Sequence, residues 1–491
     1  MNFKKLAPLA VALMLAGCAV GPDYVAPTSN LDTEYLFQGV DGTEVGEANQ
    51  HLVNAWWKQF NDPILNQLVV DAQNQAIPLK VAAQRIRMAE SYQSAIESFK
   101  VPTVSVGAGF GNLQLSENDP LLGGAITALN PLTGEDLGLV EDNNSAFFAG
   151  ATIGWEVDLF GRIDRQANAA SIRKEQMEIM REGLTTLITS DVIHNYLQMR
   201  GAQARHAIAL KTVEDQAKTL ELVKLTVKSG YGSALDEARA RAALAATKAV
   251  IPQLNIAENV HKQRLAILLG ETPKQSQHRF ATSMPLPSFT GVIPTGLPSD
   301  LLNRRPDIRI AEREMAALNE ESAAAIAAQY PKVFLTGAPG VLAKDFDDLF
   351  NGDSIAWAGS IGVSWNVFDG GRGDAIVEMQ QSRFDASVLS YQQSVITAFG
   401  EVETLLNGYG QSQQYVTLVS EAATATSFAV NKAKSLYKAG LTDHLSILDA
   451  QRQQNIVQDQ VIAAKLQTAN MTIALHKALG GNWDVVTKTA D

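Results

Sequence analysis

The chain contains a single cysteine, Cys18, among its 491 residues, so no disulfide can form within it. It also lacks long apolar runs, because no stretch, residues 6–15 included, reaches the roughly 18 apolar residues that a membrane-spanning helix requires. Positive charge is scarce as well, with 40 basic against 52 acidic residues and a net charge of −12. This excess of acid argues against a nucleic-acid-binding protein, which presents a basic face.

Patterns for catalysis or metal binding are missing from the sequence too. The seven histidines are scattered without a His-Glu-x-x-His motif, and the ten methionines form no cluster that would indicate copper or silver. His444 is expected at a surface rather than as a ligand. No Gly-x-x-x-x-Gly-Lys phosphate loop is present, so energy for any transport must come from another protein. We predict that the protein is not an enzyme and has no metal or dissociable cofactor.

Residues 1–17 have the pattern of a secretory signal peptide. Lys4 and Lys5 precede a short apolar run, and Cys18 follows Leu-Ala-Gly. This end resembles a bacterial lipobox, which implies cleavage before Cys18 and a covalent lipid such as palmitate on that residue. By the same resemblance Ala19, which is not an aspartate, implies sorting to the outer membrane.

An internal repeat with an interval of 210 residues spans most of the chain. The register holds for more than a hundred residues without an insertion, which indicates a duplication rather than chance identity. It joins Trp155 with Trp365, Gly161 with Gly371, Arg162 with Arg372, Gly230 with Gly440, and Gly270 with Gly480.

Each copy of the repeat predicts a set of helices. Residues 162–229 and 372–439 each form a run of 68 residues without proline, long enough for a helix of roughly 100 Å. Gly230 and Gly440 then predict turns, after which helices of 35 residues return over 235–269 and 445–479. Shorter helices precede these runs, restarted by prolines, over 78–99 and about 306–329. The return helix and the shorter helix of each copy should lie end to end beside the long helix.

Alternating apolar and small polar residues predict strands between the helices. The pattern is clear over 103–111, 147–158 and 354–367, with apolar residues on one face and glycine, serine and threonine on the other. A weaker strand is expected near 332–341, where Pro339 predicts an edge strand or a bulge. Small polar residues suit a water-filled interior, so the pattern favours a membrane β-barrel over a soluble sandwich.

Four strands are too few to close a barrel. The smallest single-chain barrels have about eight strands, and an open sheet edge is not stable in lipid. The sequence therefore predicts an oligomer, and three copies would supply twelve strands. Glu156 and Asp158 should face the interior at the base of this barrel and influence its ion preference.

Four stretches resemble the TolC/OprM family of outer membrane factors, in the lipoprotein branch that serves drug-efflux pumps. They are residues 18–24, 155–162, 296–308 and 365–372, of which 296–308 is the most specific. The resemblance covers nearly all of the mature chain. It implies an α+β membrane protein, a homotrimer whose 12-stranded β-barrel in the outer membrane continues into a long periplasmic α-helical barrel. It also implies two partners, a periplasmic membrane-fusion adaptor and an inner-membrane RND-type pump.

The resemblance further implies a gate at the periplasmic tips of the helices. By position, Leu445 and Asp449 would form an apolar ring and an anionic ring at the axis, and apolar constrictions resist wetting. Asp236 and Tyr437 match a pair that ties the inner helices shut in relatives. Two basic residues of some relatives are missing, since Leu436 and Thr442 stand at those positions. A weaker lock is therefore expected.

The predicted organisation has six segments: a signal peptide (1–17), a lipidated tether with equatorial residues (18–62), the first repeat (63–270), a proline-rich equatorial linker (271–298), the second repeat (299–480) and a tail (481–491). The predicted function is an outer membrane channel for multidrug efflux that conducts small molecules passively. Two alternatives stay open: the duct of a type I protein secretion system, and a structural periplasmic lipoprotein that conducts nothing.

Overall fold

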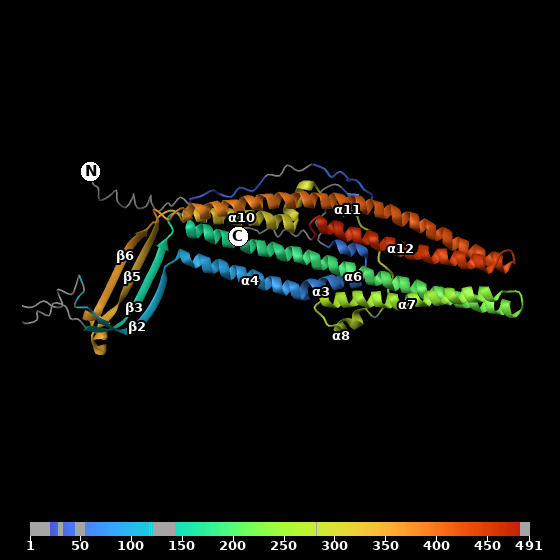
Figure 1. The fold of residues 1–491 in the computed structure, drawn as a ribbon, viewed down its shortest axis with the longest axis horizontal. Coiled ribbons are helices and arrows are strands. Elements are labelled where there is room, and N and C mark those ends of the chain that lie inside the picture. Colours follow the sequence, from blue (N-terminus) through green and yellow to red (C-terminus); the bar gives the residue numbers. More distant parts are fainter. Residues whose placement is uncertain are drawn as a thin grey trace, which may run out of the picture. The chain divides into compact units, whose positions relative to one another are not determined.

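The computed structural model describes residues 20–27, 33–44, 55–116, 118, 120, 143–280 and 282–481. The predicted signal peptide, Cys18 and nearly all of the predicted tail lie outside the described residues. The chain divides into two compact units, which we describe separately (Figure 1). The sheet unit comprises Met1–Ala26, Met88–Lys174 and Glu314–Ser387, and the helix unit comprises Pro27–Arg87, Glu175–Arg313 and Val388–Asp491. Among the described helices, none is both long and apolar enough to cross a membrane.

The sheet unit contains one antiparallel sheet of four strands in the order β2-β3-β5-β6. Its strands are β2 (Thr103–Gln114), β3 (Asn143–Val157), β5 (Lys332–Ala343) and β6 (Ile355–Ser364). The predicted strands are thus confirmed in number and place. Pairing of β3 with β5 joins the hairpin of the first repeat to the hairpin of the second, so both copies build one sheet.

The register places most large apolar side chains of the strands on one face, whereas Phe148, Phe334 and Leu342 lie on the other. Val104 lies opposite Ile153, which in turn lies opposite Gly337. Directly opposed residues point to the same face of a sheet, so the apolar rows of all four strands merge. Within one chain this face is uncovered, and Val106 and Trp357 are 84% and 80% exposed. Glycine, serine and threonine dominate the other face, as the alternation predicted.

The prediction that Pro339 marks an edge strand or a bulge was wrong. Strand β5 lies between β3 and β6, and Pro339 pairs with Trp357 of β6 without a shift of register. On the β3 side the ladder is interrupted, because Ala151 and Thr152 have no paired residue between the pairs Gly150–Gly340 and Ile153–Gly337. The missing N–H of proline is therefore accommodated by a local gap in an otherwise continuous interior strand.

Two glycines next to this gap allow an unusually close approach of β3 and β5. A Cβ atom on Gly150 would lie 2.7 Å from the Pro339 oxygen and 2.9 Å from the Gly340 Cα. A Cβ on Gly340 would lie 2.7 Å from the Ala149 oxygen. All three neighbours are backbone atoms, so no rotamer change could relieve the contact.

The repeated tryptophans make equivalent hydrogen bonds at the ends of their strands. The Trp155 indole N–H donates to the Lys100 carbonyl oxygen at 3.2 Å, and the Trp365 indole N–H donates to the Gln329 carbonyl oxygen at 2.9 Å. Each acceptor lies just after the helix that leads into the hairpin. The recurrence of tryptophan at an interval of 210 residues therefore has a structural reason, since each indole ties the end of one strand to the start of its hairpin.

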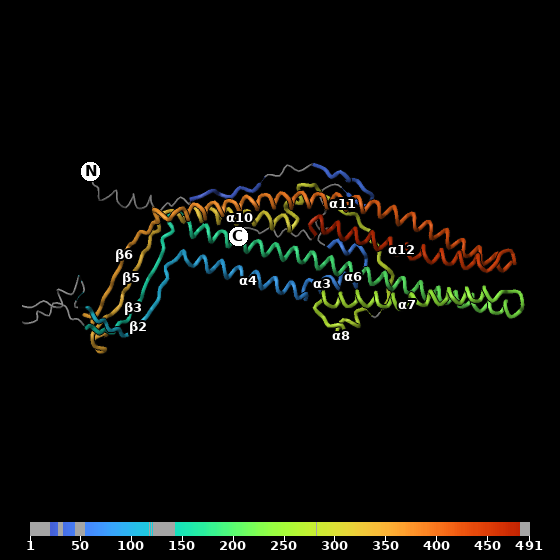
Figure 2. Tube along the Cα trace, in the orientation of Figure 1, coloured from blue at the N-terminus to red at the C-terminus, as the bar shows by residue number. Residues whose placement is uncertain are grey.

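The long helices match their predicted bounds to within a residue. Helices α6 (Arg162–Lys228) and α11 (Arg372–Lys438) are followed by the return helices α7 (Ala234–Leu268) and α12 (His444–Ala478), and Figure 2 traces the two turns that join them. The shorter helices are α3 (Pro63–Gln75), α4 (Ile77–Glu97), α8 (Pro273–Ser276), α9 (Leu301–Arg304) and α10 (Pro306–Ala327). In the two segments predicted to be equatorial, β1 (Thr43–Glu44) pairs in parallel with β4 (Ile293–Pro294).

The repeated glycines end these helices in the left-handed conformation. Gly230 has a φ of 77° and Gly440 a φ of 72°. In each copy the glycine N–H and the next N–H donate back to carbonyls of the last helical turn; Gly440 donates to Tyr437 and Leu441 donates to Leu436. This pair of backbone hydrogen bonds is the Schellman motif, which favours glycine at the position just after the helix. The repeat therefore conserves helix ends as well as helix lengths.

Contacts within the helix unit confirm the end-to-end placement of the shorter helices. The end of α7 reaches the α3–α4 junction, where a Cβ on Gly270 would lie 3.1 Å from the Gln75 oxygen. In the second copy, Arg305 Nη1 donates to the Ala478 oxygen at 2.9 Å, which joins the end of α12 to the α9–α10 junction.

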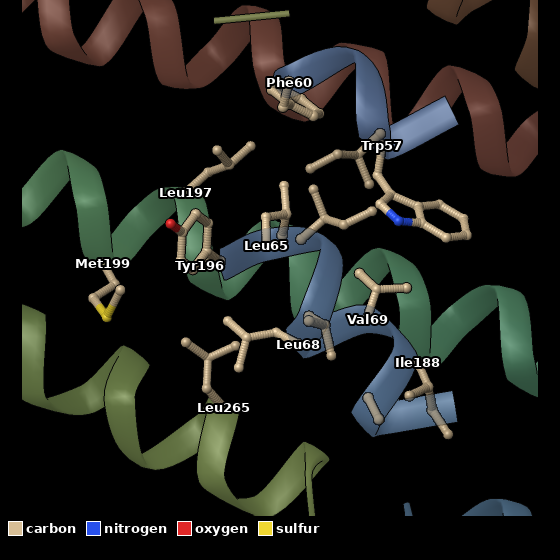
Figure 3. Close-up of a cluster of buried hydrophobic side chains, with 14 of the residues drawn as sticks. Trp57, Phe60, Leu65, Leu68, Val69, Ile188, Tyr196, Leu197, Met199 and Leu265 are labelled. Atoms are coloured by element: carbon tan, nitrogen blue, oxygen red, sulfur yellow. The ribbon is translucent and has the colours of Figure 1, made fainter. Parts of the chain in front are cut away.

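The main hydrophobic core lies where α3 packs against α6, α7 and α12 (Figure 3). Leu65 and Tyr196 are fully buried there. The Trp56 ring stacks on His476 with ring centroids 4.2 Å apart. Burial lowers the pKa of His476 to about 3, so this imidazole is neutral and acts as a core side chain.

Candidate gate and duct wall

The two helical turns of the helix unit are held by side-chain caps at equivalent positions. In the first turn, Ser233 and Asp236 form a capping box, with the Asp236 N–H donating to Ser233 Oγ at 3.2 Å. In the second turn, Asp443 caps α12, and the Ser446 N–H donates to its carboxylate at 3.1 Å. Ser233 and Asp443 are related by the interval of 210 residues, so both copies start the return helix in the same way.

Leu445 and Asp449 lie one turn apart near the start of α12, as their spacing predicted. Leu445 is 47% exposed within the single chain. The Asp449 side chain is 67% exposed and accepts a hydrogen bond from Arg452 Nη2 at 2.8 Å. Neither side chain is needed by the core of its own chain. Both are therefore available to face other copies, which a ring at an axis would require.

Asp236 and Tyr437 do not bond to each other in the described part of the chain. Instead, Asp236 Oδ2 accepts the Ser233 hydroxyl at 2.8 Å. The Tyr437 ring meets the His444 ring edge to face, with centroids 5.8 Å apart. Asp236 also acts electrostatically on His444. Within one chain, His444 has both residues as neighbours. The role of Asp236 and Tyr437 in holding the gate shut stays a prediction.

His444 was expected at the surface, and this expectation was wrong. The residue is 7% exposed, and within the described residues neither ring nitrogen has a hydrogen-bond partner. Burial lowers its pKa, while the carboxylates of Asp236 and Asp443 oppose that shift. The sequence contained no signal for this burial, because it depends on three segments that come together only in the fold.

The polar face of the sheet has the properties of a duct wall. Part of it is a hollow lined mainly by short side chains and glycines, among them Thr103, Ser105 and Thr152. The hydroxyls of Thr336 and Ser360 lie 2.7 Å apart across β5 and β6. Short hydroxyl-bearing side chains keep such a surface wet and leave it unobstructed.

Glu156 and Asp158 both have structural partners at the base of the sheet. The Glu156 carboxylate accepts from Arg162 Nη2 at 2.8 Å, and both side chains are 20% exposed. The Asp158 carboxylate accepts the Asp164 N–H at 2.8 Å and thus caps the start of α6. The ion pair offsets the charge of Glu156, so its expected influence on ion preference is weaker than the sequence suggested.

The segment after Cys18 is anchored at the same end of the sheet, which sequence reasoning missed. The Val20 N–H donates to the Phe160 oxygen at 3.1 Å, and Asn319 Nδ2 donates to the Pro22 oxygen at 3.0 Å. Arg165 donates to Asp23 at 2.7 Å and to the largely buried Glu320 at 3.0 Å. Val20, two residues after Cys18, is therefore held beside the turn that starts α6.

Comparison with known proteins identifies relatives along nearly the whole chain. The solvent efflux pump outer membrane protein SrpC of Pseudomonas putida is 29% identical over 494 residues, which cover 99% of either chain. The cation efflux system protein CusC of Escherichia coli is 26% identical and covers 98% of this chain and 99% of its own.

Solved structures share the fold described above. The outer-membrane channel OprN has a TM-score of 0.84 and 31% identity, over 95% of this chain and 100% of its own. The open-state MtrE outer membrane channel of Neisseria gonorrhoeae, at 22% identity, has a TM-score of 0.80 over 95% of this chain and 98% of its own. These similarities confirm the predicted fold class, in which strands and long helices are built from a twofold internal repeat.

The family assignment comes from two long matches that follow the two copies of the repeat. Residues 68–271 and 297–481 match the family described as outer membrane efflux protein. Together these ranges contain most of the chain, including all four strands of the antiparallel sheet and both helical turns. The chain therefore belongs to the outer membrane efflux protein family.

Proposed function

We propose that the protein is the exit duct of a tripartite efflux system, through which small molecules pass passively from the periplasmic side across the outer membrane. The two-faced sheet carries this proposal. One face presents a continuous apolar surface, including Val106, Trp357 and Ile361, that one chain leaves exposed. The opposite face presents glycine, serine and threonine. Such a sheet suits lipid on one side and water on the other.

The proposed assembly is a homotrimer with a shared barrel. Strands β2 and β6 form the two edges of the sheet in the described chain. An unpaired edge in lipid would leave backbone N–H and C=O groups without partners. Three copies, each adding its β2 edge to the β6 edge of the next, would close twelve strands and leave no edge. The helical turns of the three chains would then surround the gate formed by Leu445 and Asp449, with Asp236 and Tyr437 supporting it.

The proposed partners are a periplasmic membrane-fusion adaptor and an inner-membrane RND-type pump. The relatives are named for efflux of solvents, toluene, antibiotics and cations. Cargo of such different chemistry suits a wide duct lined by small hydroxyl-bearing residues, with selection made by the pump. No phosphate loop occurs in this sequence, so the pump would also supply the energy.

We further propose that the mature chain begins at Cys18 and that this residue carries lipid. The hydrogen bond from Val20 to Phe160 supports this proposal, because it holds the residue two positions after Cys18 at the base of the sheet. Two or more acyl chains would anchor the N-terminus stably in a membrane. Mass spectrometry of the N-terminal peptide should find Cys18 as the first residue with acyl groups attached, and an unmodified Cys18 would overturn the proposal.

Single-channel recording separates the duct from a structural lipoprotein. The purified protein, reconstituted into a planar bilayer, should produce discrete ion conductance steps, because the polar sheet face would enclose water. A spacer without a conducting barrel would produce none. Boiling the sample before reconstitution supplies the control, since dissociated chains cannot close the barrel and should give no steps.

A further inference from the structure

We propose that His444 is a proton-sensitive latch, which packs the helical turns together while its ring is neutral and releases them when the ring takes up a proton. The proposal concerns regulation of the gate and so rests on the proposed function. It assigns a role to a buried side chain that neither the fold nor the proposed duct requires.

Three segments of the helix unit converge on this one imidazole. His444 is the first residue of α12, directly after the cap residue Asp443. Its ring packs edge to face against Tyr437, near the end of α11, at 5.8 Å between centroids. Asp236, in the first turn of α7, is close enough to act on its charge. A change at His444 therefore affects both helical turns, the one between α6 and α7 and the one between α11 and α12.

Among the residues that the structure describes, the buried ring has no hydrogen-bond partner to hold it in place. Neither nitrogen of His444 makes a hydrogen bond in the described part of the chain. By contrast, His194 bonds to Asn470 at 2.9 Å, and His261 bonds to Asn195 at 3.0 Å. A neutral imidazole tolerates such a site better than an imidazolium, because burying an unpaired charge costs far more than burying a neutral ring. Packing of His444 therefore depends on its being neutral.

The charged groups around the ring make release possible. Asp443 and Asp236 attract a protonated ring, and both carboxylates belong to exposed or half-exposed residues. The positive end of the α12 dipole opposes a cation at the first helical residue. A protonated ring is thus driven from the buried site and can pair with either carboxylate in water.

The direction of the pH effect follows from linkage. Burial is the largest influence on the pKa of His444 and lowers it below its ordinary value. An exposed, released ring would have a pKa of about 6.5. The packed state therefore binds protons less readily, and acidification below about pH 6.5 favours the released state. Protonation of a single histidine changes the ratio of released to packed protein by at most about tenfold per pH unit. Assembly into a trimer can only increase the burial of His444.

Bilayer conductance between pH 7.5 and pH 5.5 tests the latch. Wild-type protein should show a several-fold rise in open probability as the pH falls. His444→Phe should remove that rise, because phenylalanine fills the site and does not titrate. His444→Gln supplies a second side chain that does not titrate, which decides the test if the phenylalanine variant does not assemble. His278→Gln is the matched control, since His278 is exposed and lies in the linker, and it should keep the rise.

The outcomes distinguish the latch from the duct. A wild-type response that is flat over this range, or a rise that survives in both His444 variants, would overturn the latch and leave the duct intact. Absence of conductance at every pH would overturn the proposed function, and the latch with it. Hydrogen bonds from Ser446 lower the pKa of Asp443, so this carboxylate stays ionised over the range used and contributes little to the signal.

Discussion

Gly150→Val is expected to reduce the amount of assembled protein in the outer membrane by about tenfold or more. The new Cβ would lie 2.7 Å from the Pro339 oxygen and 2.9 Å from the Gly340 Cα. Both are backbone atoms of β5, so the strands must move apart to relieve the contact. In the described sheet, the two β-hairpins are connected only by the pairing of β3 with β5. Separation of these two strands would therefore divide the sheet into two hairpins.

Gly154→Val provides a matched control for this prediction. Gly154 lies on the same strand and the same face, but a Cβ at that position meets nothing within 4 Å. The measurement is the fraction of protein that runs as an undissociated oligomer in unheated electrophoresis of outer membranes. Equal amounts of oligomer for the two variants would show that the close approach at Gly150 does not control pairing.

Leu445→Ser combined with Asp449→Ala is expected to raise single-channel conductance several-fold and to weaken cation preference. The first change would remove the proposed apolar ring, which would resist wetting, and the second would remove the proposed anionic ring, which would attract cations. Neither change should unfold the chain. Leu445 is already 47% exposed, and exposed ion pairs such as Asp449–Arg452 contribute little to stability.

The internal repeat supplies the control for the gate. Leu235 occupies the position of α7 that Leu445 occupies in α12, and it is 57% exposed. Leu235→Ser should therefore match Leu445→Ser in its effect on folding but leave conductance near the wild-type value. The position equivalent to Asp449 is Arg239, so the first copy cannot supply an anionic ring. A similar rise from Leu235→Ser would show that the constriction is not specific to α12.

Much of the fold followed from local signals in the sequence. Runs without proline predicted α6 and α11, and Gly230 and Gly440 marked their ends, because a left-handed residue after a helix favours glycine. The alternation in β6 predicted which face is apolar, since strand geometry has a period of two. These features depend on short stretches of chain, so neighbouring residues were sufficient to predict them.

The errors arose where distant segments meet. Pro339 suggested an edge or a bulge because proline lacks an N–H, yet the local gap beside Ala151 accommodates it inside the sheet. His444 looked like a surface residue because only the fold brings α7, α11 and α12 around it. No local pattern reports such contacts.

Drug resistance in a cell that lacks its own outer membrane efflux channels tests the central claim most directly. The gene would be expressed with a compatible adaptor and pump, and minimal inhibitory concentrations measured for antibiotics, dyes and detergents. The proposed duct predicts restored resistance that Gly154→Val retains and Gly150→Val loses. If wild-type protein assembles as an outer membrane oligomer beside a functional pump and restores no resistance, while secretion of a protein substrate depends on it, then the protein serves protein export and the small-molecule efflux function is contradicted.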